Sequence, residues 1–414
     1  MSKHFDALET RSDAERAAWL AVALPKQIAH AKANTPWFAE SLKSIDATKI
    51  TSREALATLP VIRKHDLIAM QKAKLPFGGM VASSWGQLGR VFSSPGPIYE
   101  PEGREANYWR TARALYAAGF RSGDLVHNSY SYHMTPGGWI FEAGAQALGC
   151  TVFPAGVGQT EQQVAAMADL QPQGYAGTPS FLRILLQKAD EMGVKLPSLT
   201  KAVVSGEAFL PVVRDELLAR GIAGYQAYAT AELGVIAYET AAREGLVTDE
   251  GVLIEIVRPG TGDPVGLGEV GEVVVTTFNT DYPLIRFGTG DLSAVLPGVS
   301  PCGRTNMRIK GWMGRADQTT KIKGMFVHPE QVAAVVKRHP EILKARLVVT
   351  NLDSNDLMTL HCEASAGATA SDGFAKAVAD SLRDVTKLRG ELAFVAAGDL
   401  PNDGKVISDE RKYD

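Results

Sequence analysis

Cysteine is scarce in this 414-residue chain, which contains only Cys150, Cys302 and Cys362. Three widely spaced thiols cannot form a paired disulfide framework, so we expect a reducing, cytoplasmic environment. Cys302 has no closely spaced cysteine or histidine to complete a metal site, and we therefore predict no zinc.

Long apolar runs and an excess of charge of either sign are also missing. No uncharged apolar stretch approaches the ~20 residues that a membrane helix needs, and the first residues lack the pattern of a signal peptide. The 43 basic and 46 acidic residues give a formal net charge of −3, so no strong field favours nucleic acid. We expect no membrane span and no nucleic-acid partner, and any site for a polyanion must be built locally.

The hydrophobic residues, 45% of the chain, are sufficient for two or three cores. Apolar runs alternate with helical patterns between about residues 90 and 240, which predicts parallel strands joined by crossover helices. One helix is expected from Arg104 to Ala118. The pattern becomes β-rich at about 245–312, and an α+β pattern follows Asp317. We predict an α/β fold with a large domain of mixed and parallel sheets (1–316), which includes a β-rich subdomain, and a small α+β domain (317–414).

Four groups of segments follow one another along the chain: AAGFRSGDLVHNSYSYHMTPGG and LGCTVFPAGVGQT; VVSGEAFLP and YQAYATAELG; GEVGEVVVTTFNTDYPLIRFGTGDLS; and CGRTNMRIKGWMGRADQTTKIKGMFVHPEQV with LPNDGKVISDERK. In these segments and in their order, the chain resembles the phenylacetate–coenzyme A ligase branch of the adenylate-forming superfamily over nearly its whole length. The resemblance implies that ATP and Mg²⁺ activate a small, aromatic carboxylic acid as an acyl-adenylate, and that coenzyme A then takes the acyl group. It also implies a mobile C-terminal lid domain and a homodimer.

The resemblance assigns the nucleotide site residue by residue. Asp291 resembles the aspartate that binds both ribose hydroxyls, a contact for which a carboxylate has two acceptor oxygens. Arg315 resembles the arginine at the ribose and phosphate end, and Tyr228 the aromatic residue beside the adenine. The loop over the adenine face corresponds to Gly206, Glu207 and Ala208. Each residue also has an ordinary structural interpretation, such as a β-turn aspartate for Asp291.

Other assignments concern the chemistry and the domain movement. Lys405 resembles the lysine of the mobile domain that bridges the carboxylate and the α-phosphate, a task that suits a compact charge on a flexible stem. Glu232 resembles the glutamate that supports magnesium, although it could simply be a carboxylate at the start of a helix. Asp317 occupies the hinge position. His133, between aromatic residues, lies in the region that lines the acyl pocket, where the alternative is a purely structural histidine.

The phosphate loop departs from the pattern. The family has a Ser/Thr/Gly-rich loop that ends in Gly-Lys, and of this loop Ser93 and Ser94 remain as candidate phosphate ligands. Tyr99 replaces the lysine, Glu100 would repel phosphate, and Pro95 and Pro97 remove two N–H donors; Ala231 likewise replaces the hydroxyl residue before the glutamate. Losing two or three charge-assisted hydrogen bonds costs roughly 3–9 kcal/mol. Either another group such as Arg104 compensates, or the geometry differs, or adenylation is lost.

Three functions therefore stay open from the sequence. The first is an AMP-forming aryl–coenzyme A ligase, which the joint retention of Asp291, Arg315 and Lys405 favours. The second is transfer of an acyl-adenylate to an amine or a carrier protein. The third is a degenerate ligase that binds nucleotide or acyl-coenzyme A without turnover.

Overall fold

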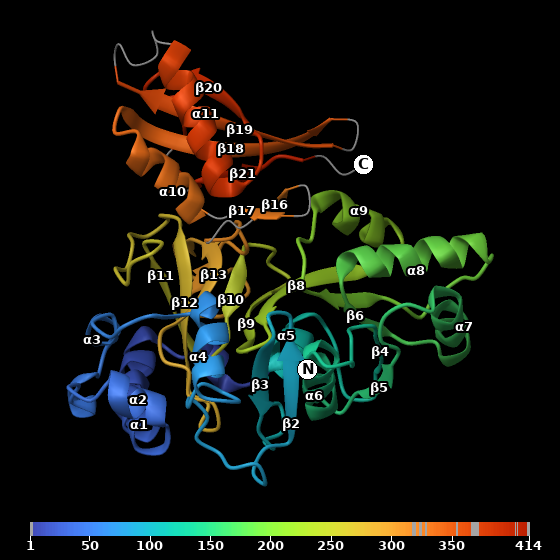
Figure 1. Ribbon diagram of the computed structural model, residues 1–414. Coiled ribbons are helices and arrows are strands. Elements are labelled where there is room, and N and C mark those ends of the chain that lie inside the picture. Colours follow the sequence, from blue (N-terminus) through green and yellow to red (C-terminus); the bar gives the residue numbers. More distant parts are fainter. Residues whose placement is uncertain are drawn as a thin grey trace. The chain divides into compact units, whose positions relative to one another are not determined.

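The computed structural model describes residues 3–316, 320–322, 325–327, 329–352, 355–365, 372–401, 403 and 405–411 (Figure 1). Its contacts divide the chain into two compact units. The first unit comprises Met1–Thr289 and Ser293–Trp312, and the second comprises Gly290–Leu292 and Met313–Asp414. In the described ranges, no helix combines the length and the apolarity that crossing a membrane requires.

A nine-stranded sheet, in the order β14-β15-β10-β9-β8-β7-β6-β4-β5, forms the centre of the first unit. Five of its strands run parallel: β4 (Leu125–Asn128), β5 (Thr151–Pro154), β6 (Gly174–Gly177), β7 (Lys201–Val204) and β8 (Ala223–Thr230). The other four pair antiparallel: β9 (Gly234–Glu239), β10 (Leu246–Thr248), β14 (Val295–Leu296) and β15 (Arg308–Ile309). The parallel strands with crossover helices confirm the predicted α/β fold.

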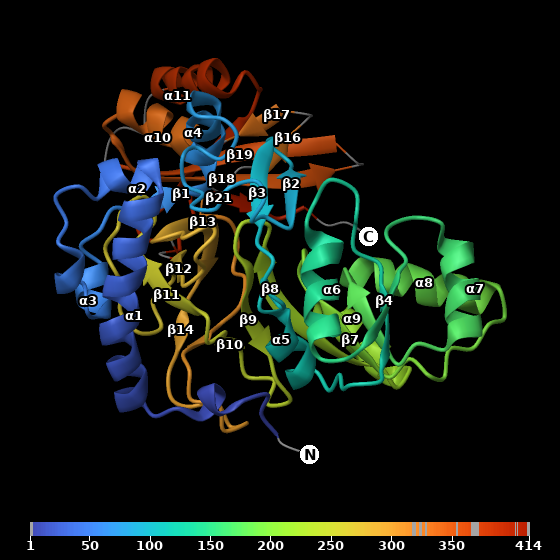
Figure 2. The same ribbon diagram turned by 90° about the horizontal axis from the view of Figure 1, so that it is seen from below.

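Helices cover both faces of this sheet because its central strands are apolar on both sides. Ala176 and Val203 pack with α5 (Thr111–Ala117) and α6 (Gly137–Ala147). Their neighbours Tyr175 and Val204 point to the opposite face, where α7 (Thr160–Leu170), α8 (Pro179–Glu191) and α9 (Pro211–Ala219) complete another core (Figure 2). Successive side chains of a strand alternate between the faces, so one short apolar run serves two cores.

The helix expected from Arg104 to Ala118 begins only at Thr111, in α5. Asn107 and Arg110 have φ values of 58° and 63°, in the left-handed region, which a continuing α-helix cannot include. The Asn107 side chain instead accepts a hydrogen bond of 3.0 Å from the Ala112 N–H. This part of the prediction was wrong because the helical spacing does not reveal the local turn.

A second sheet, in the order β1-β13-β12-β11, packs with the N-terminal helices. Its strands are β1 (Ile62–Arg63), β11 (Val252–Val257), β12 (Gly271–Thr277) and β13 (Phe287–Ser293). The helices are α1 (Asp13–Asn34), which continues through Pro25, α2 (Pro36–Ser41), α3 (Arg53–Leu56) and α4 (Leu67–Ala73), with short 3₁₀ turns η1 (Ala7–Thr10), η2 (Ala47–Lys49) and η3 (Lys64–Asp66). The strands at 245–312, where a β-rich subdomain is expected, are thus divided between the two sheets.

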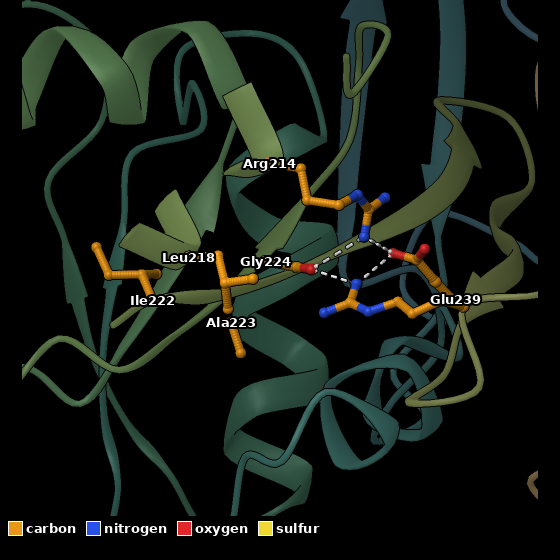
Figure 3. Close-up of a pocket in the computed structure, with 7 residues that line it drawn as sticks. Arg214, Leu218, Ile222, Ala223, Gly224 and Glu239 are labelled. Atoms are coloured by element: carbon orange, nitrogen blue, oxygen red, sulfur yellow. Dashed lines mark hydrogen bonds and ion pairs between the residues drawn. The ribbon is translucent and has the colours of Figure 1, made fainter. Parts of the chain in front are cut away.

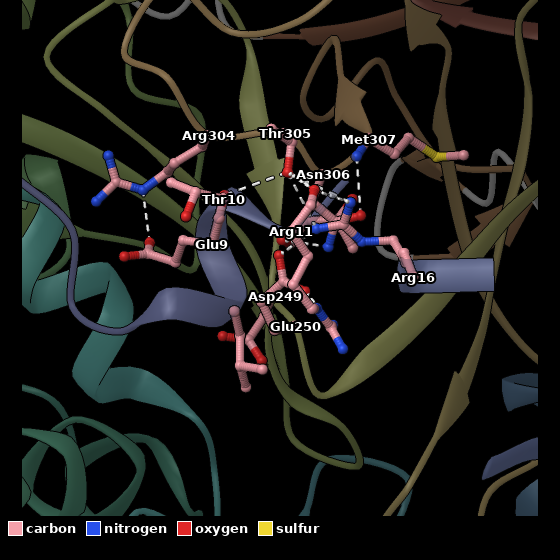
Figure 4. Close-up of polar contacts among 12 residues, drawn as sticks. Glu9, Thr10, Arg11, Arg16, Asp249, Glu250, Arg304, Thr305, Asn306 and Met307 are labelled. Carbon is pink, nitrogen blue, oxygen red and sulfur yellow. Dashed lines mark hydrogen bonds and ion pairs between the residues drawn. The ribbon is translucent and has the colours of Figure 1, made fainter. Parts of the chain in front are cut away.

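Buried ionic contacts hold the N-terminal segment on the first unit (Figure 4). Glu9 is buried and accepts a hydrogen bond from the guanidinium group of Arg304. Glu250 is also buried and pairs with both Arg11 and Arg16, with an N···O distance of 2.9 Å to Arg16. Because buried carboxylates need such partners, these contacts link residues 9–16 to the loops at 250 and 304.

The second unit has a core of its own. Its four-stranded sheet has the order β20-β19-β18-β21, with β18 (Ile342–Leu352), β19 (Asn355–Ala364), β20 (Glu391–Val395) and β21 (Ile407–Asp409). Val335 of α10 (Pro329–Arg338) and Val378 of α11 (Asp372–Thr386) pack with Leu347 and Leu360 of the sheet. A hairpin of β16 (Thr320–Ile322) and β17 (Met325–Val327) precedes α10.

Candidate functional site

The two residues predicted at the ribose contact each other directly. Asp291, in β13, accepts a hydrogen bond of 3.0 Å from Nη1 of Arg315, and the two residues also form an isolated antiparallel β-bridge. The Asp291 side chain is largely buried, whereas the Arg315 side chain is 38% exposed. Gly290 makes this approach possible: its φ is +75°, and a Cβ on it would lie 2.9 Å from Nη2 of Arg315. An arginine and a carboxylate are thereby fixed side by side.

Tyr228 lies in β8, near the carboxyl end of the strand. Its ring is buried, and its hydroxyl group donates a hydrogen bond of 3.1 Å to Oγ1 of Thr289 in β13. Thr289 in turn donates to the carbonyl of Val273 at 3.0 Å. The tyrosine is therefore held in place at the end of a parallel strand, which is where open α/β sheets bind ligands.

The loop predicted over the adenine follows β7, the neighbour of β8 in the sheet. Gly206, Glu207 and Ala208 are exposed, and Gly206 needs its φ of +87° to turn the chain away from the strand. The Glu207 carboxylate accepts a hydrogen bond of 2.6 Å from the N–H of Ser180 in the first turn of α8. This contact fixes the loop against the helix. Because β7 and β8 run parallel, the loop lies at the edge of the sheet toward which β8 also runs.

Glu232, the predicted magnesium residue, is fully buried and pairs with a lysine that the sequence did not reveal. Nζ of Lys64, in η3, lies 2.8 Å from Oε1 of Glu232, whose side chain is 0% exposed. Oε2 of Glu232 has no hydrogen-bond partner among the described residues, nor has the buried hydroxyl group of Tyr282. Burial raises the pKa of Tyr282, and the nearby Glu232 and Glu100 carboxyl groups raise it further.

The Glu232 carboxylate fits a magnesium ion that arrives bound to the phosphates of ATP. No group of three or more metal-ligating side chains occurs in the described part of the chain. Mg²⁺ at phosphate sites usually takes only one or two carboxylates and fills its shell with phosphate oxygens and water. Among the described residues, the Glu232 oxygen without a hydrogen-bond partner has the chemistry of such a ligand, and Lys64 contacts the other oxygen of the carboxylate at 2.8 Å.

The segment expected as a phosphate loop is a β-hairpin. β2 (Arg90–Ser94) pairs antiparallel with β3 (Ile98–Glu102), so that Ser94 lies opposite Ile98. The N–H of Ser94 donates to Oε2 of Glu100 at 3.3 Å, and its hydroxyl group donates to Oε1 of the same carboxyl. The N–H of Ser93 donates to the carbonyl of Met134 at 2.8 Å. Both donors of Ser94 and the N–H of Ser93 are thus engaged within the protein.

Burial raises the pKa of Glu100 to about 8. The Ser94 hydroxyl and Lys64 lower this pKa, whereas the Glu232 carboxylate raises it. Glu100 is fully buried, so the cost of placing a charge away from water dominates. The sequence predicted repulsion between an ionised Glu100 and phosphate; at neutral pH the buried group is instead largely a neutral acid.

His133 is exposed, and the structure does not gather it with the neighbouring tyrosines. Tyr130 stacks on Phe141 with ring centroids 4.5 Å apart, and Tyr132 meets Trp139 edge-on at 5.1 Å. The Tyr132 hydroxyl group also donates to Glu142 at 2.8 Å. The aromatic residues therefore form two separate pairs, and the role of His133 at the acyl pocket stays a prediction.

Lys405, in the second unit, is exposed. Its N–H donates to Asp403 at 3.0 Å, and its carbonyl accepts a hydrogen bond of 3.1 Å from Nε of Arg346. The backbone is thereby fixed at the point from which the lysine side chain extends into solvent. Asp317, the predicted hinge, lies outside the described residues.

A cavity of about 420 Å³ in the first unit contains none of the predicted site residues (Figure 3). Arg214 and Arg243 line it and share Oε2 of Glu239, at 3.0 and 2.8 Å. Gly224, at the start of β8, also contributes to the lining. The cavity therefore adjoins the beginning of the strand, whereas Tyr228 lies toward its carboxyl end.

Comparison with known proteins identifies relatives over most of the chain. The family model for AMP-binding enzymes matches residues 106–280. A phenylacetate–coenzyme A ligase of Thermus thermophilus is 33% identical over 339 residues, which cover 77% of this chain and 75% of that protein. A phenylacetate–coenzyme A ligase of Aromatoleum evansii is 30% identical over 376 residues, which cover 86% and 84%.

A solved structure matches the chain almost from end to end. It is a 2-hydroxyisobutyryl-CoA ligase in complex with 2-HIB-AMP and CoA, in the thioester-forming state. It is 26% identical to this chain, with a TM-score of 0.74, and the match covers 99% of this chain and 93% of that one. The similarity therefore includes both units.

Proposed function

Because the chain belongs to the phenylacetate–coenzyme A ligase branch of the adenylate-forming superfamily, we propose that it is an AMP-forming aryl–coenzyme A ligase. In the first half-reaction, the carboxylate of the acid attacks the α-phosphate of ATP and pyrophosphate leaves. In the second, the thiol of coenzyme A attacks the acyl carbonyl and AMP leaves. The direct contact of Asp291 with Arg315, at 3.0 Å, is the observation that carries this proposal.

Each nucleotide group has a candidate partner of suitable chemistry. The Asp291 carboxylate accepts from the ribose hydroxyls, and the adjacent Arg315 places a permanent positive charge near the phosphate end. The ring of Tyr228 and the loop of Gly206, Glu207 and Ala208 enclose the adenine. For the outer phosphates the sequence offers Ser93 and Ser94, but both donors of Ser94 and the N–H of Ser93 are engaged within the protein.

In this proposal two positively charged groups, Mg²⁺ and Lys405, balance the negative charge on the reacting phosphate. Glu232 offers its unpartnered oxygen to Mg²⁺, and Lys64 orients the carboxylate from its other side. When bound, Mg²⁺ supplies Lewis-acid stabilisation of the phosphoryl oxygens. Lys405 then provides the mobile positive charge that bridges the substrate carboxylate and the α-phosphate.

The two half-reactions need different positions of the C-terminal lid domain, residues 317–414. In our proposal Asp317 is the hinge about which this domain rotates, because one residue can absorb the required change in dihedral angles. The rotation withdraws Lys405 after adenylation and opens a path for the thiol. The exposed position of Lys405, whose N–H and carbonyl group are both hydrogen-bonded, suits such a role.

The proposed substrate is an aromatic acid. The curated relatives are named for phenylacetate, and Tyr130, Tyr132 and His133 supply aromatic side chains for a flat ring. The structural neighbour is named for 2-hydroxyisobutyrate, which has no ring, and this acid is a natural comparison substrate. We further propose a cytoplasmic homodimer; sedimentation at the mass of a single 44.3 kDa chain would contradict the dimer.

Pyrophosphate release with phenylacetate, benzoate and 2-hydroxyisobutyrate tests the function directly. We expect release with an aryl acid, MgATP and enzyme, and a coenzyme A thioester as the final product. If pyrophosphate is released but the acyl group is transferred only when an amine or a carrier protein is present, the acceptor is not coenzyme A. AMP binding without any pyrophosphate release would identify a degenerate binding protein and refute the ligase.

A further inference from the structure

The hairpin that replaces the phosphate loop already contains an acceptor for its own donors. Both hydrogen-bond donors of Ser94, the N–H and the hydroxyl group, point to the two oxygens of Glu100. Ser94 and Glu100 are both buried, so water does not compete for these contacts. The two strands hold the residues in register across the hairpin, with Ser94 opposite Ile98 and Phe92 opposite Glu100.

Few other donors remain for a phosphate at this place. Pro95 and Pro97, in the turn, have no N–H, and the N–H of Ser93 is bonded to the carbonyl of Met134. The charged neighbours of Glu100 are Glu232 and Lys64, and Lys64 is engaged by Glu232 at 2.8 Å. Phosphate sites depend on several converging N–H groups or a cation. Near Ser94 the hairpin offers neither while Ser94 is bonded to Glu100, because its positively charged residue, Arg90, lies at the start of β2 and pairs with Glu102.

We infer that the Glu100 carboxyl group accepts the hydrogen bonds of Ser94 in place of a phosphate. The outer phosphates of ATP therefore gain no affinity from this hairpin. Glu100 thereby determines how strongly the protein distinguishes ATP from AMP. The raised pKa of Glu100 agrees with this role, since a largely neutral acid needs no counter-ion in its buried place. The inference rests on the proposed function, because it assumes that a nucleotide occupies the site.

Calorimetric titration of the full-length protein with MgATP and with AMP tests the inference without any substitution. AMP lacks the outer phosphates, so the ratio of the two affinities isolates their contribution. We expect the two dissociation constants to agree within about threefold. ATP that binds ten times more tightly than AMP, or better, would overturn the inference.

Glu100→Met then removes the acceptor while roughly preserving the volume of the side chain. The freed N–H and hydroxyl group of Ser94 become available to phosphate, and charge-assisted bonds are about twice as strong as neutral ones. We expect the preference for ATP over AMP to rise by about tenfold. An unchanged or lower preference in a folded Glu100→Met protein would overturn the inference, because Glu100 would then be inert or would assist phosphate binding.

Glu102→Met is the matched control. Glu102 is also a buried glutamate of β3, but it accepts from Nη1 of Arg90 at 3.0 Å and from Nε1 of Trp109 at 3.1 Å. We expect this variant to keep the ATP-to-AMP ratio of the parent protein, and the same rise in both variants would contradict a specific role for Glu100. Absence of AMP binding to the parent protein would refute the proposed nucleotide site itself. Normal AMP binding with an unexpected ratio would refute only the role of Glu100.

Discussion

Replacing Arg286 by methionine is expected to destabilise the first unit strongly. Arg286 is 1% exposed and makes a bidentate ion pair with Glu255, with both N···O distances at 3.0 Å. Its remaining N–H groups donate to the carbonyls of Ala57, Leu59 and Gly262. This one side chain therefore joins the segment before β1 to β11 and to the loop before β12.

The magnitude follows from what the substitution leaves behind. In Arg286→Met, Glu255 loses its bidentate partner in a buried place where burial already raises its pKa. Removing one partner of a buried pair costs about 3–5 kcal/mol. Replacing both charges by apolar groups is often neutral, so Arg286→Met/Glu255→Met is expected to regain at least about 2 kcal/mol.

Urea unfolding followed by tryptophan fluorescence measures this effect in the relevant unit. All six tryptophans lie in the first unit, so the signal does not report on the second. Arg183→Met is the control, because Arg183 and its partner Glu216 are an exposed pair, 2.7 Å apart, worth at most about 1 kcal/mol. A loss below about 1 kcal/mol in Arg286→Met, or a double variant no more stable than the single one, would refute the reasoning.

Three further predictions concern the candidate site. Asp291→Ala removes the acceptor that we propose for both ribose hydroxyls and is expected to weaken AMP binding by roughly 10²–10⁴-fold in calorimetry. A loss below about fivefold would contradict the ribose contact. Gly290→Ala places a Cβ beside Arg315 on a residue with a left-handed backbone conformation. We expect a loss of about 1–2 kcal/mol in stability, measured by differential scanning calorimetry. An unchanged melting temperature would contradict this strain. Glu100 has a pKa of about 8 in the folded state, whereas its pKa in the unfolded chain is near 4.5. The folded state therefore holds the proton more tightly, and the stability that Glu100 contributes falls as the pH rises from 4.5 to 8. The slope of this fall is up to about 1.4 kcal/mol per pH unit. Glu100→Gln should flatten this decline in urea unfolding at pH 5 to 8, and parallel curves for both proteins would refute the shift.

The fold was largely predictable from the sequence because its strands are short apolar runs between amphipathic helices. Val203 and Val204 illustrate the pattern: adjacent apolar residues of one strand serve opposite faces of the sheet. The start of α5 was not predictable, because nothing in the spacing shows that Asn107 and Arg110 adopt left-handed conformations. Local turns of this kind depend on contacts such as that of Asn107 with Ala112.

The candidate site was predictable only where a motif contains the residues. Asp291 and Arg315 were expected at the same end of the nucleotide, and they form an ion pair. The pairing of Lys64 with Glu232 was missed, because a lysine beside His65 and Asp66 resembles an ordinary solvated residue. The sequence indicated that the phosphate loop is abnormal but could not show that Ser94 would bond to Glu100 across a hairpin.

The central claim is that Lys405, on the lid domain, serves adenylation and not thioester formation. Lys405→Ala should be assayed in each half-reaction separately: pyrophosphate release from MgATP and an aryl acid, and thioester formation from a preformed acyl-adenylate and coenzyme A. Lys376→Ala is the control, since Lys376 is an exposed lysine of α11 in the same unit. Our account predicts that Lys405→Ala slows adenylation by at least about 100-fold, because the loss of one electrostatic contact to a transition state has an effect of this size. Thioester formation should be slowed far less. Equal rates of pyrophosphate release in the parent protein and in Lys405→Ala would contradict it.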